Sequence, residues 1–229
     1  MGCMLETLHD SQWLDRILTD TKIEDQASLR KALTVLHETY SVPNVVISSI
    51  PMEPWLRDLT PPHIRSPIND RDQSLLCLVS VRGRPLSTVY AGCIPLIPGY
   101  FSGVGDLFSA LVLGHYRTNV LQHSHLPPSE NGINASLPPP SLPPLPHAVS
   151  LALTKTHAIL RLTQNHASSL PPEERTTTDD ELDKEDPERL IRRMRGRELR
   201  HVQGRRILSG EAMGELRLLQ EWEDFWGPN

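Results

Sequence analysis

The sequence predicts an α/β fold, and three stretches carry that prediction. Residues 26–40 place apolar side chains on one face of a helix, and residues 42–50 then indicate a buried strand, so the two form an α/β unit. Residues 75–81 and 87–97 indicate two further strands joined by a hairpin turn. The second of these strands leads into a glycine-rich turn and an apolar helix at 99–116.

The glycine-rich turn is suited to binding a phosphate group. Gly99, Gly103 and Gly105 lie close together, Asp106 follows, and apolar residues at helical spacing begin at Leu107. The first amides of a helix have no partner inside it, and the aligned peptide dipoles add positive potential there. Glycine also has no side chain that would keep an anion away.

Asp106 has two interpretations at this stage. In the structural one, the carboxylate caps the start of the helix and the glycines only shape the turn. In the chemical one, Asp106 accepts a proton from a hydroxyl group that attacks a phosphoryl group. The neighbouring amides would then stabilise the charge on the phosphate oxygens.

The string Gly-Tyr-Phe-Ser-Gly-Val-Gly-Asp-Leu-Phe-Ser-Ala-Leu-Val-Leu, residues 99–113, closely resembles the Gly-Thr-Gly-Asp region of pyridoxal kinases. These enzymes are a branch of the ribokinase-like fold, and the fungal members are the most similar. The resemblance implies that Asp106 is the catalytic base and that the amides of Gly103, Val104 and Gly105 form the anion hole. Val104 stands where many relatives have Thr, so the backbone contribution is kept and a hydroxyl contact to the nucleotide is lost.

Ser48 and Ser49 close the strand at 42–50. In an open α/β sheet the ligand crevice lies outside the carboxyl ends of the strands, so both hydroxyls are expected at that edge. A pair of serines that merely ends a strand is the structural alternative. In pyridoxal kinases a hydroxyl pair at this place contacts the nucleotide phosphates, so the resemblance implies a nucleotide-binding role.

The resemblance covers most of residues 17–226 and matches only the C-terminal half of a pyridoxal kinase. It implies a partial ribokinase-like three-layer fold that lacks the N-terminal half, which in the family supplies most of the pyridoxal pocket. The family also carries an Asn-x-x-Glu element whose Glu helps to organise magnesium and phosphates. Ser11 and Leu14 stand in those places, so this element is absent or replaced.

The expected organisation combines the resemblance with shifts in composition. A Pro-rich stretch and a charged stretch indicate disordered insertions. The helix after the Pro-rich stretch resembles the one that walls the adenine site in the fungal kinases. The parts are a divergent N-terminal segment (1–16), the nucleotide-binding part (17–116), a Pro-rich linker (117–146), a helix of the same domain (147–170), a charged mobile segment (171–197), and a closing strand at 198–203 with the C-terminal tail, which is expected to dock on the core (198–229).

Composition and charge argue against several classes of protein. A net charge of -5 argues against a general nucleic-acid binder, and no apolar run is long enough to cross a bilayer. Cys3, Cys77 and Cys93 lack the spacing of a zinc site or a disulfide framework. We therefore expect a protein of the cytoplasm, and also of the nucleus, with no metal-ligand set, no membrane partner and no nucleic-acid partner.

The predicted activity is transfer of the γ-phosphate of ATP to the 5′-hydroxyl of pyridoxal, which forms pyridoxal 5′-phosphate in vitamin B6 salvage. ATP and pyridoxal are the expected substrates. Mg²⁺ is implied by phosphoryl transfer in general, and a homodimer is implied by the family alone. Two alternatives stay open: a truncated, catalytically silent relative that binds nucleotide or a partner, and a ribokinase-like kinase of another small alcohol.

Overall fold

A computed structural model describes most of the chain, namely residues 21–65, 73–99, 101–124, 142–172 and 184–227. The chain forms two compact units. The first unit comprises Met1–Leu96, Ser109–Ala152 and Arg217–Asn229. The second unit comprises Ile97–Phe108 and Leu153–Leu216.

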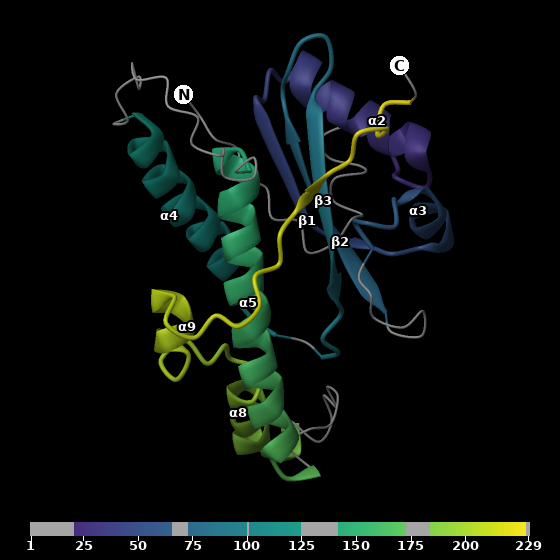
Figure 1. The fold of residues 1–229 in the computed structure, drawn as a ribbon. Helices are drawn as coiled ribbons and strands as arrows, with labels where there is room; N and C mark the ends of the chain where they lie inside the picture. Colours follow the sequence, from purple (N-terminus) through teal and green to yellow (C-terminus); the bar gives the residue numbers. More distant parts are fainter. Residues whose placement is uncertain (1–20, 66–72, 100, 125–141, 173–183, 228–229) are drawn as a thin grey trace. The chain divides into compact units, whose positions relative to one another are not determined.

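An antiparallel sheet organises the first unit (Figure 1). Its strands are β1 (Asn44–Pro51), β2 (Ser74–Val81), β3 (Thr88–Pro95) and β4 (Gln220–Glu221), in the order β1-β2-β3-β4. Every neighbouring pair is antiparallel, so the expected hairpin between the second and third strands is confirmed. The rule that ligands bind at the carboxyl ends of strands applies to open α/β sheets built on parallel strands, so it does not carry over to this sheet.

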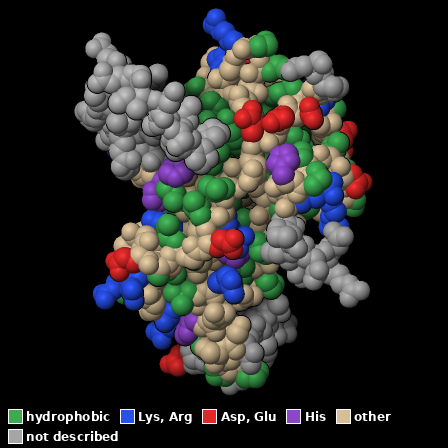
Figure 2. All heavy atoms as spheres, in the orientation of Figure 1, with side chains coloured by type: hydrophobic (Ala, Val, Ile, Leu, Met, Phe, Trp, Pro, Cys, Tyr) green, Lys and Arg blue, Asp and Glu red, His purple; other side chains and the backbone are tan. Residues whose placement is uncertain are grey.

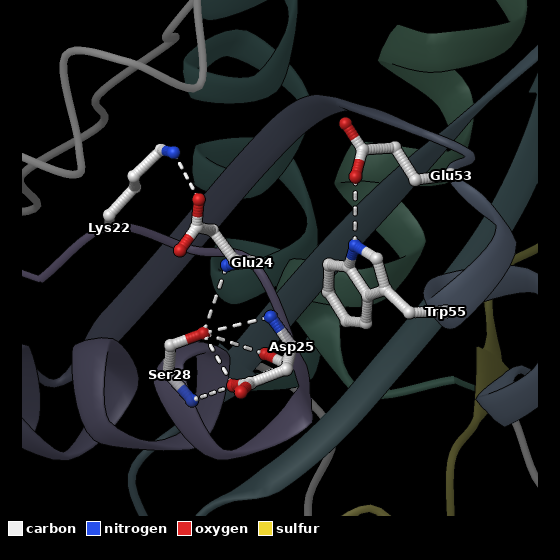
Figure 3. A network of polar contacts seen from close by, with 6 residues as sticks. All are labelled: Lys22, Glu24, Asp25, Ser28, Glu53 and Trp55. Carbon is white, nitrogen blue, oxygen red and sulfur yellow. Dashed lines mark hydrogen bonds and ion pairs between the residues drawn. The ribbon is translucent and has the colours of Figure 1, made fainter.

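The helix α2 (Gln26–Thr34) begins with a capping box. The Ser28 amide donates to Asp25 Oδ1 at 2.7 Å, and the Asp25 amide donates to Ser28 Oγ at 3.0 Å. The Ser28 amide and the Ser28 hydroxyl both donate to Asp25 Oδ1, and these two hydrogen bonds lower the pKa of the Asp25 carboxyl. Figure 3 shows this cap with two nearby polar contacts, Lys22 with Glu24 and Trp55 with Glu53.

A π-helical turn, η2 (Val35–Thr39), continues α2. The Tyr40 amide accordingly bonds to the carbonyl five residues back, that of Val35, at 3.2 Å. The expected apolar face is therefore confirmed for Leu29, Leu33 and Leu36, which are buried, and it is wrong for Tyr40, which is 53% exposed. The wider turn rotates Tyr40 away from the face that the regular helical period predicts.

Apolar side chains from α2, the sheet and the C-terminal tail form the core of the first unit. The tail docks there as expected, since Trp222 and Phe225 are buried and their rings meet edge to face at 5.2 Å. The indole N–H of Trp226 donates to the Ser87 carbonyl at 2.7 Å. The core comprises Leu29, Leu33, Leu36, Val42, Val45, Ile47, Ile50, Leu56, Ile64, Leu76, Leu78, Val89, Ala91, Trp222 and Phe225.

Three segments expected to be irregular contain helices. The content of Pro, Asp and Arg in the stretch 51–72 predicts a loop, yet α3 (Pro54–Leu59) forms within it because Pro54 suits the first helical turn and Leu56 is buried. Both ends of the expected Pro-rich linker are helical, since α4 (Val104–Ser124) runs into it and α5 (Pro144–Ser169) begins inside it. The charged segment contains α8 (Pro187–Arg195). Residues 1–16, 125–141 and 173–183 lie outside the described residues.

The closing strand differs from the one expected at 198–203. In the second unit this stretch makes one isolated bridge, between Glu198 and Ser102, and then turns into α9 (Arg205–Ser209). Local hydrogen bonds explain the difference, because the Gly204 amide donates to the Arg200 carbonyl at 2.8 Å. The strand that closes the sheet is β4. It begins at the last residue of the hexad 215–220, whose sequence is similar to that of 198–203.

The described surface carries mixed charge. On the face drawn in Figure 2, Lys and Arg side chains are interspersed with Asp and Glu among apolar and uncharged side chains. Within the part of the chain that the structure describes, every helix is too short or too polar to span a bilayer.

Candidate functional site

The glycine turn opens α4 in the second unit. Gly103 precedes the helix with φ +81°, a left-handed conformation that favours glycine. Its carbonyl accepts the first helical hydrogen bond, from the Leu107 amide at 3.0 Å. Among the described residues, a Cβ added at Gly103 would have no neighbour within 4 Å, so the described chain leaves the space over the turn open.

Three amide groups are available at this helix start. Because Gly103 provides the first carbonyl acceptor, the N–H groups of Val104, Gly105 and Asp106 have no acceptor inside α4. Gly103 occupies the N-cap position and has no side chain to cap them. The positive end of the helix dipole adds to these donors, so the turn can hold a phosphate-sized anion.

Asp106 lies in the first turn of α4 with an exposed side chain. It is the third helical residue, so the N-cap interpretation of its carboxylate does not apply; the N-cap is Gly103. A carboxylate in the first turn still interacts favourably with the helix dipole. It is also accessible to a hydroxyl group that approaches the turn, as a general base must be.

The residue before the turn is held by backbone pairing within the second unit. The Ser102 amide donates to the Arg197 carbonyl at 3.1 Å, and Ser102 forms a parallel bridge with Glu198. The N-terminal side of the glycine turn is therefore tied to the stretch that follows α8.

Ser48 and Ser49 lie in a β-bulge of β1, in the first unit. The register runs from Ile47 opposite Leu78 to Ile50 opposite Leu76, so β1 contains one extra residue at the two serines. Successive residues of a regular strand point to opposite faces, but the two serine Oγ atoms are only 3.5 Å apart. The bulge thus brings both hydroxyls together.

The bulge also corrects the expectation that the two serines end the strand. β1 continues to Pro51, and Ser48 is buried whereas Ser49 is half-buried. The predicted site residues therefore form two groups: Gly103, Val104, Gly105 and Asp106 in the second unit, and Ser48 with Ser49 in the first unit.

The described residues provide no evident set of ligands for a metal ion. They contain no group of three or more His, Cys, Asp or Glu side chains that could hold one. We therefore assign no residue to Mg²⁺ and derive no step through it.

A row of buried polar side chains on α5 was not predicted from the sequence. Thr163 is fully buried, and its hydroxyl accepts a hydrogen bond from the Arg200 amide at 3.1 Å. Lys155 is also buried, and its Nζ donates to the Leu208 carbonyl at 2.6 Å. Burial lowers the pKa of the Lys155 ammonium. The available signal was the presence of Thr and Lys inside an otherwise apolar helix.

The chain is similar in sequence to curated fungal proteins that are named as putative pyridoxal kinases. One, from Schizosaccharomyces pombe, is 27% identical over 211 residues, which is 91% of this chain and 53% of that protein. Another, from Saccharomyces cerevisiae, is 31% identical over 110 residues, which is 48% of this chain and 29% of that protein. No protein-family model matches the chain.

The fold is similar to that of solved pyridoxal kinases. The enzyme from Leishmania donovani in complex with ADP and pyridoxamine matches with a TM-score of 0.54 at 19% identity. Its complex with ADP and pyridoxine matches with a TM-score of 0.52. The first match covers 93% of this chain and 50% of the enzyme, so the chain spans about half the length of the proteins that it resembles.

Proposed function

We propose that this chain performs the nucleotide-binding and catalytic part of pyridoxal kinase chemistry, the transfer of the ATP γ-phosphate to the 5′-hydroxyl of pyridoxal. One observation carries the proposal: an exposed carboxylate follows directly after an uncapped, glycine-shaped helix start, in a chain similar to pyridoxal kinases. Structures of the similar L. donovani enzyme were solved in complex with ADP and pyridoxamine and with ADP and pyridoxine.

The glycine turn supports the chemical step. Asp106 accepts the proton of the 5′-hydroxyl while the hydroxyl oxygen forms a bond to the γ-phosphorus. The bond from that phosphorus to the β,γ-bridging oxygen breaks, and ADP leaves. The amides of Val104 and Gly105, with that of Gly103 beside them, stabilise the negative charge on the transferred phosphoryl group. Gly103 leaves the open space that the phosphate needs.

The two serines of the β-bulge supply nucleotide contacts in this proposal. Their hydroxyls are 3.5 Å apart, a spacing that lets both donate to oxygens of one phosphate group. Ser49 is the more accessible of the two. Mg²⁺ bound to the nucleotide would neutralise part of the phosphate charge.

A second candidate function is nucleotide binding without turnover. The observation that favours it is the coverage of the relatives, because the chain matches about half of the L. donovani enzyme. A phosphotransferase that acts on another small alcohol is the third candidate, since the proposal assigns no residue to the recognition of pyridoxal.

Two measurements on the purified chain test the proposal. Calorimetry measures ADP binding, and absorbance measures pyridoxal 5′-phosphate formation from ATP, Mg²⁺ and pyridoxal. Binding together with turnover is the expected result. Binding without turnover on pyridoxal supports the silent relative, turnover on another alcohol supports the third candidate, and absence of ADP binding overturns the proposal.

A further inference from the structure

We propose that residues 197–204 are a brace that holds the glycine turn in its phosphate-binding shape, and that Thr163 on α5 is the positioning residue that fixes this brace. The inference rests on the proposed function, and it assigns a role to residues outside the glycine turn and the serine pair. All of its contacts lie within the second unit.

The first contact joins the brace to the turn. Ser102, which directly precedes Gly103, pairs with the brace through its amide and the Arg197 carbonyl at 3.1 Å. The parallel bridge between Ser102 and Glu198 extends this pairing by one residue. A shift of the brace would therefore move the backbone that sets the left-handed conformation of Gly103.

The second contact joins the brace to α5. The Arg200 amide donates to Thr163 Oγ1 at 3.1 Å, and the same hydroxyl donates to the Ile159 carbonyl at 2.8 Å. Thr163 is 0% exposed, and both hydrogen bonds hold its hydroxyl. The hydroxyl thus has one orientation, in which its lone pair faces the brace.

The third contact is steric and involves Gly204, the last residue of the brace. A Cβ added there would lie 2.1 Å from Ile159 Cδ1 and 3.0 Å from the Arg200 carbonyl oxygen. Its φ is -88°, so the requirement for glycine is one of space and not of backbone conformation. A side chain at position 204 would displace the buried Ile159 side chain, so glycine allows the brace to lie this close to α5.

These contacts form one chain from helix to turn. On α5, the Ile159 carbonyl orients the Thr163 hydroxyl, which accepts from the Arg200 amide. Three residues before Arg200, the Arg197 carbonyl accepts from the Ser102 amide. The hydroxyl of Thr163 therefore acts on the nucleotide site only through the backbone of the brace. Its removal should change nucleotide affinity without removing any group that touches the nucleotide.

Three single variants on α5 test the brace. Thr163→Val removes the hydroxyl at nearly constant volume, and Thr163→Ser keeps it. Thr156→Val is the matched control, because Thr156 is also buried on α5 and its Oγ1 has no hydrogen-bond partner among the described residues. The measurements are ADP affinity by calorimetry and amide hydrogen exchange at Ser102 and Arg200.

We expect Thr163→Val to weaken ADP binding by about tenfold and to speed exchange at Ser102 by at least that factor. Thr163→Ser should stay within about twofold of the unsubstituted chain, as should Thr156→Val. A loss of stability alone would not explain why Thr163→Ser keeps the ADP affinity and the exchange rate of the unsubstituted chain. It would also not speed exchange at the Ser102 amide in particular.

Unchanged ADP affinity and unchanged Ser102 exchange in Thr163→Val would overturn the brace. If Thr163→Val does not fold, exchange in the unsubstituted chain decides, because fast exchange at both Ser102 and Arg200 contradicts the two hydrogen bonds. If the unsubstituted chain does not bind ADP, the proposed function fails, while the exchange data still decide whether the brace exists.

Discussion

The two units bury different kinds of side chain. At the centre of the first unit, strands and α2 bring together apolar residues such as Leu33, Leu78 and Phe225. In the second unit, the buried residues of α5 include a polar set: Thr154, Lys155, Thr156, His157 and Thr163. Apolar burial is non-directional and mainly stabilises, whereas a buried hydrogen bond fixes a position. Substitutions in the apolar core of the first unit should therefore change stability, and those around the glycine turn should change function.

The largest effect is expected at Asp106. Asp106→Asn keeps the shape and removes the proton acceptor, so turnover should fall by about 10²–10⁴-fold. The side chain is exposed, so the free energy of unfolding should change by less than about 0.5 kcal/mol. Steady-state kinetics and urea unfolding measure the two quantities. Asp58→Asn, at an exposed position of α3, should change neither one. Full turnover in Asp106→Asn would remove Asp106 from the mechanism.

The second prediction concerns the core of the first unit, where a substitution should have a large effect on stability. Phe225 is fully buried, and its ring lies 5.0 Å from the Trp226 ring, so Phe225→Ala should lower the free energy of unfolding by about 3–5 kcal/mol. Urea unfolding of this unit measures the loss. Leu218→Ala serves as the control, because Leu218 is 48% exposed and should cost about 0.5 kcal/mol or less. Equal losses in both variants would contradict a tail packed into the core.

The strands and the glycine turn could be predicted because their signals are local. The continuous apolar runs predicted β1, β2 and β3 to within about two residues of their observed ends. The three neighbouring glycines likewise predicted a turn before α4, and Gly103 has the positive φ that only glycine adopts readily.

Features that depend on a distant partner could not be predicted. The hexads at 198–203 and 215–220 share the pattern Glu-Leu-Arg-x-x-Gln, yet the second alone joins the sheet, because it leads into the tail that packs on the core. The bulge at Ser48 and Ser49 depends on the register with β2, which no local pattern specifies. The role of Thr163 as a hydrogen-bond acceptor could not be predicted, because its donor is the amide of Arg200, far along the chain.

The third prediction tests the one nucleotide contact proposed for the first unit. Replacing both Ser48 and Ser49 by Ala should weaken ADP binding by about tenfold, because hydrogen bonds to charged oxygens are lost. Calorimetry measures this change. Ser169→Ala is the control, since that exposed hydroxyl already donates to the His166 carbonyl at 2.7 Å. Unchanged affinity in the double variant would contradict a role of the two serines in nucleotide binding.

His37 is a buried polar residue beside the apolar core of the first unit. Its Nδ1 lies 2.7 Å from the Val42 carbonyl, which can only accept, so Nδ1 carries the proton. Its Nε2 lies 2.7 Å from Ser80 Oγ, and the Ser80 hydroxyl donates to Ser87 Oγ at 2.8 Å. Burial lowers the pKa of His37, and the positive charge of Arg82 adds to this effect against the opposing Val42 carbonyl and Glu38.

The smallest effect is a loss of stability of the first unit in mild acid. The His37 pKa is lower in the folded state than its ordinary value of 6.5, so the unfolded state binds more protons as the pH falls through that value. The free energy of unfolding should therefore be lower at pH 5.5 than at pH 7.5. Urea unfolding at both values, compared with His37→Gln, isolates this contribution. An identical pH dependence in the variant would contradict it.

The contacts of α2 with the C-terminal tail have a consequence for biosynthesis. Arg30 Nε donates to the Phe225 carbonyl at 2.7 Å, across a separation of 195 residues in the chain. On the ribosome, α2 emerges long before the aromatic residues that cover it, so the first unit cannot finish folding until residue 225 has left the exit tunnel. Until then the apolar face of α2 lacks the aromatic side chains that pack against it.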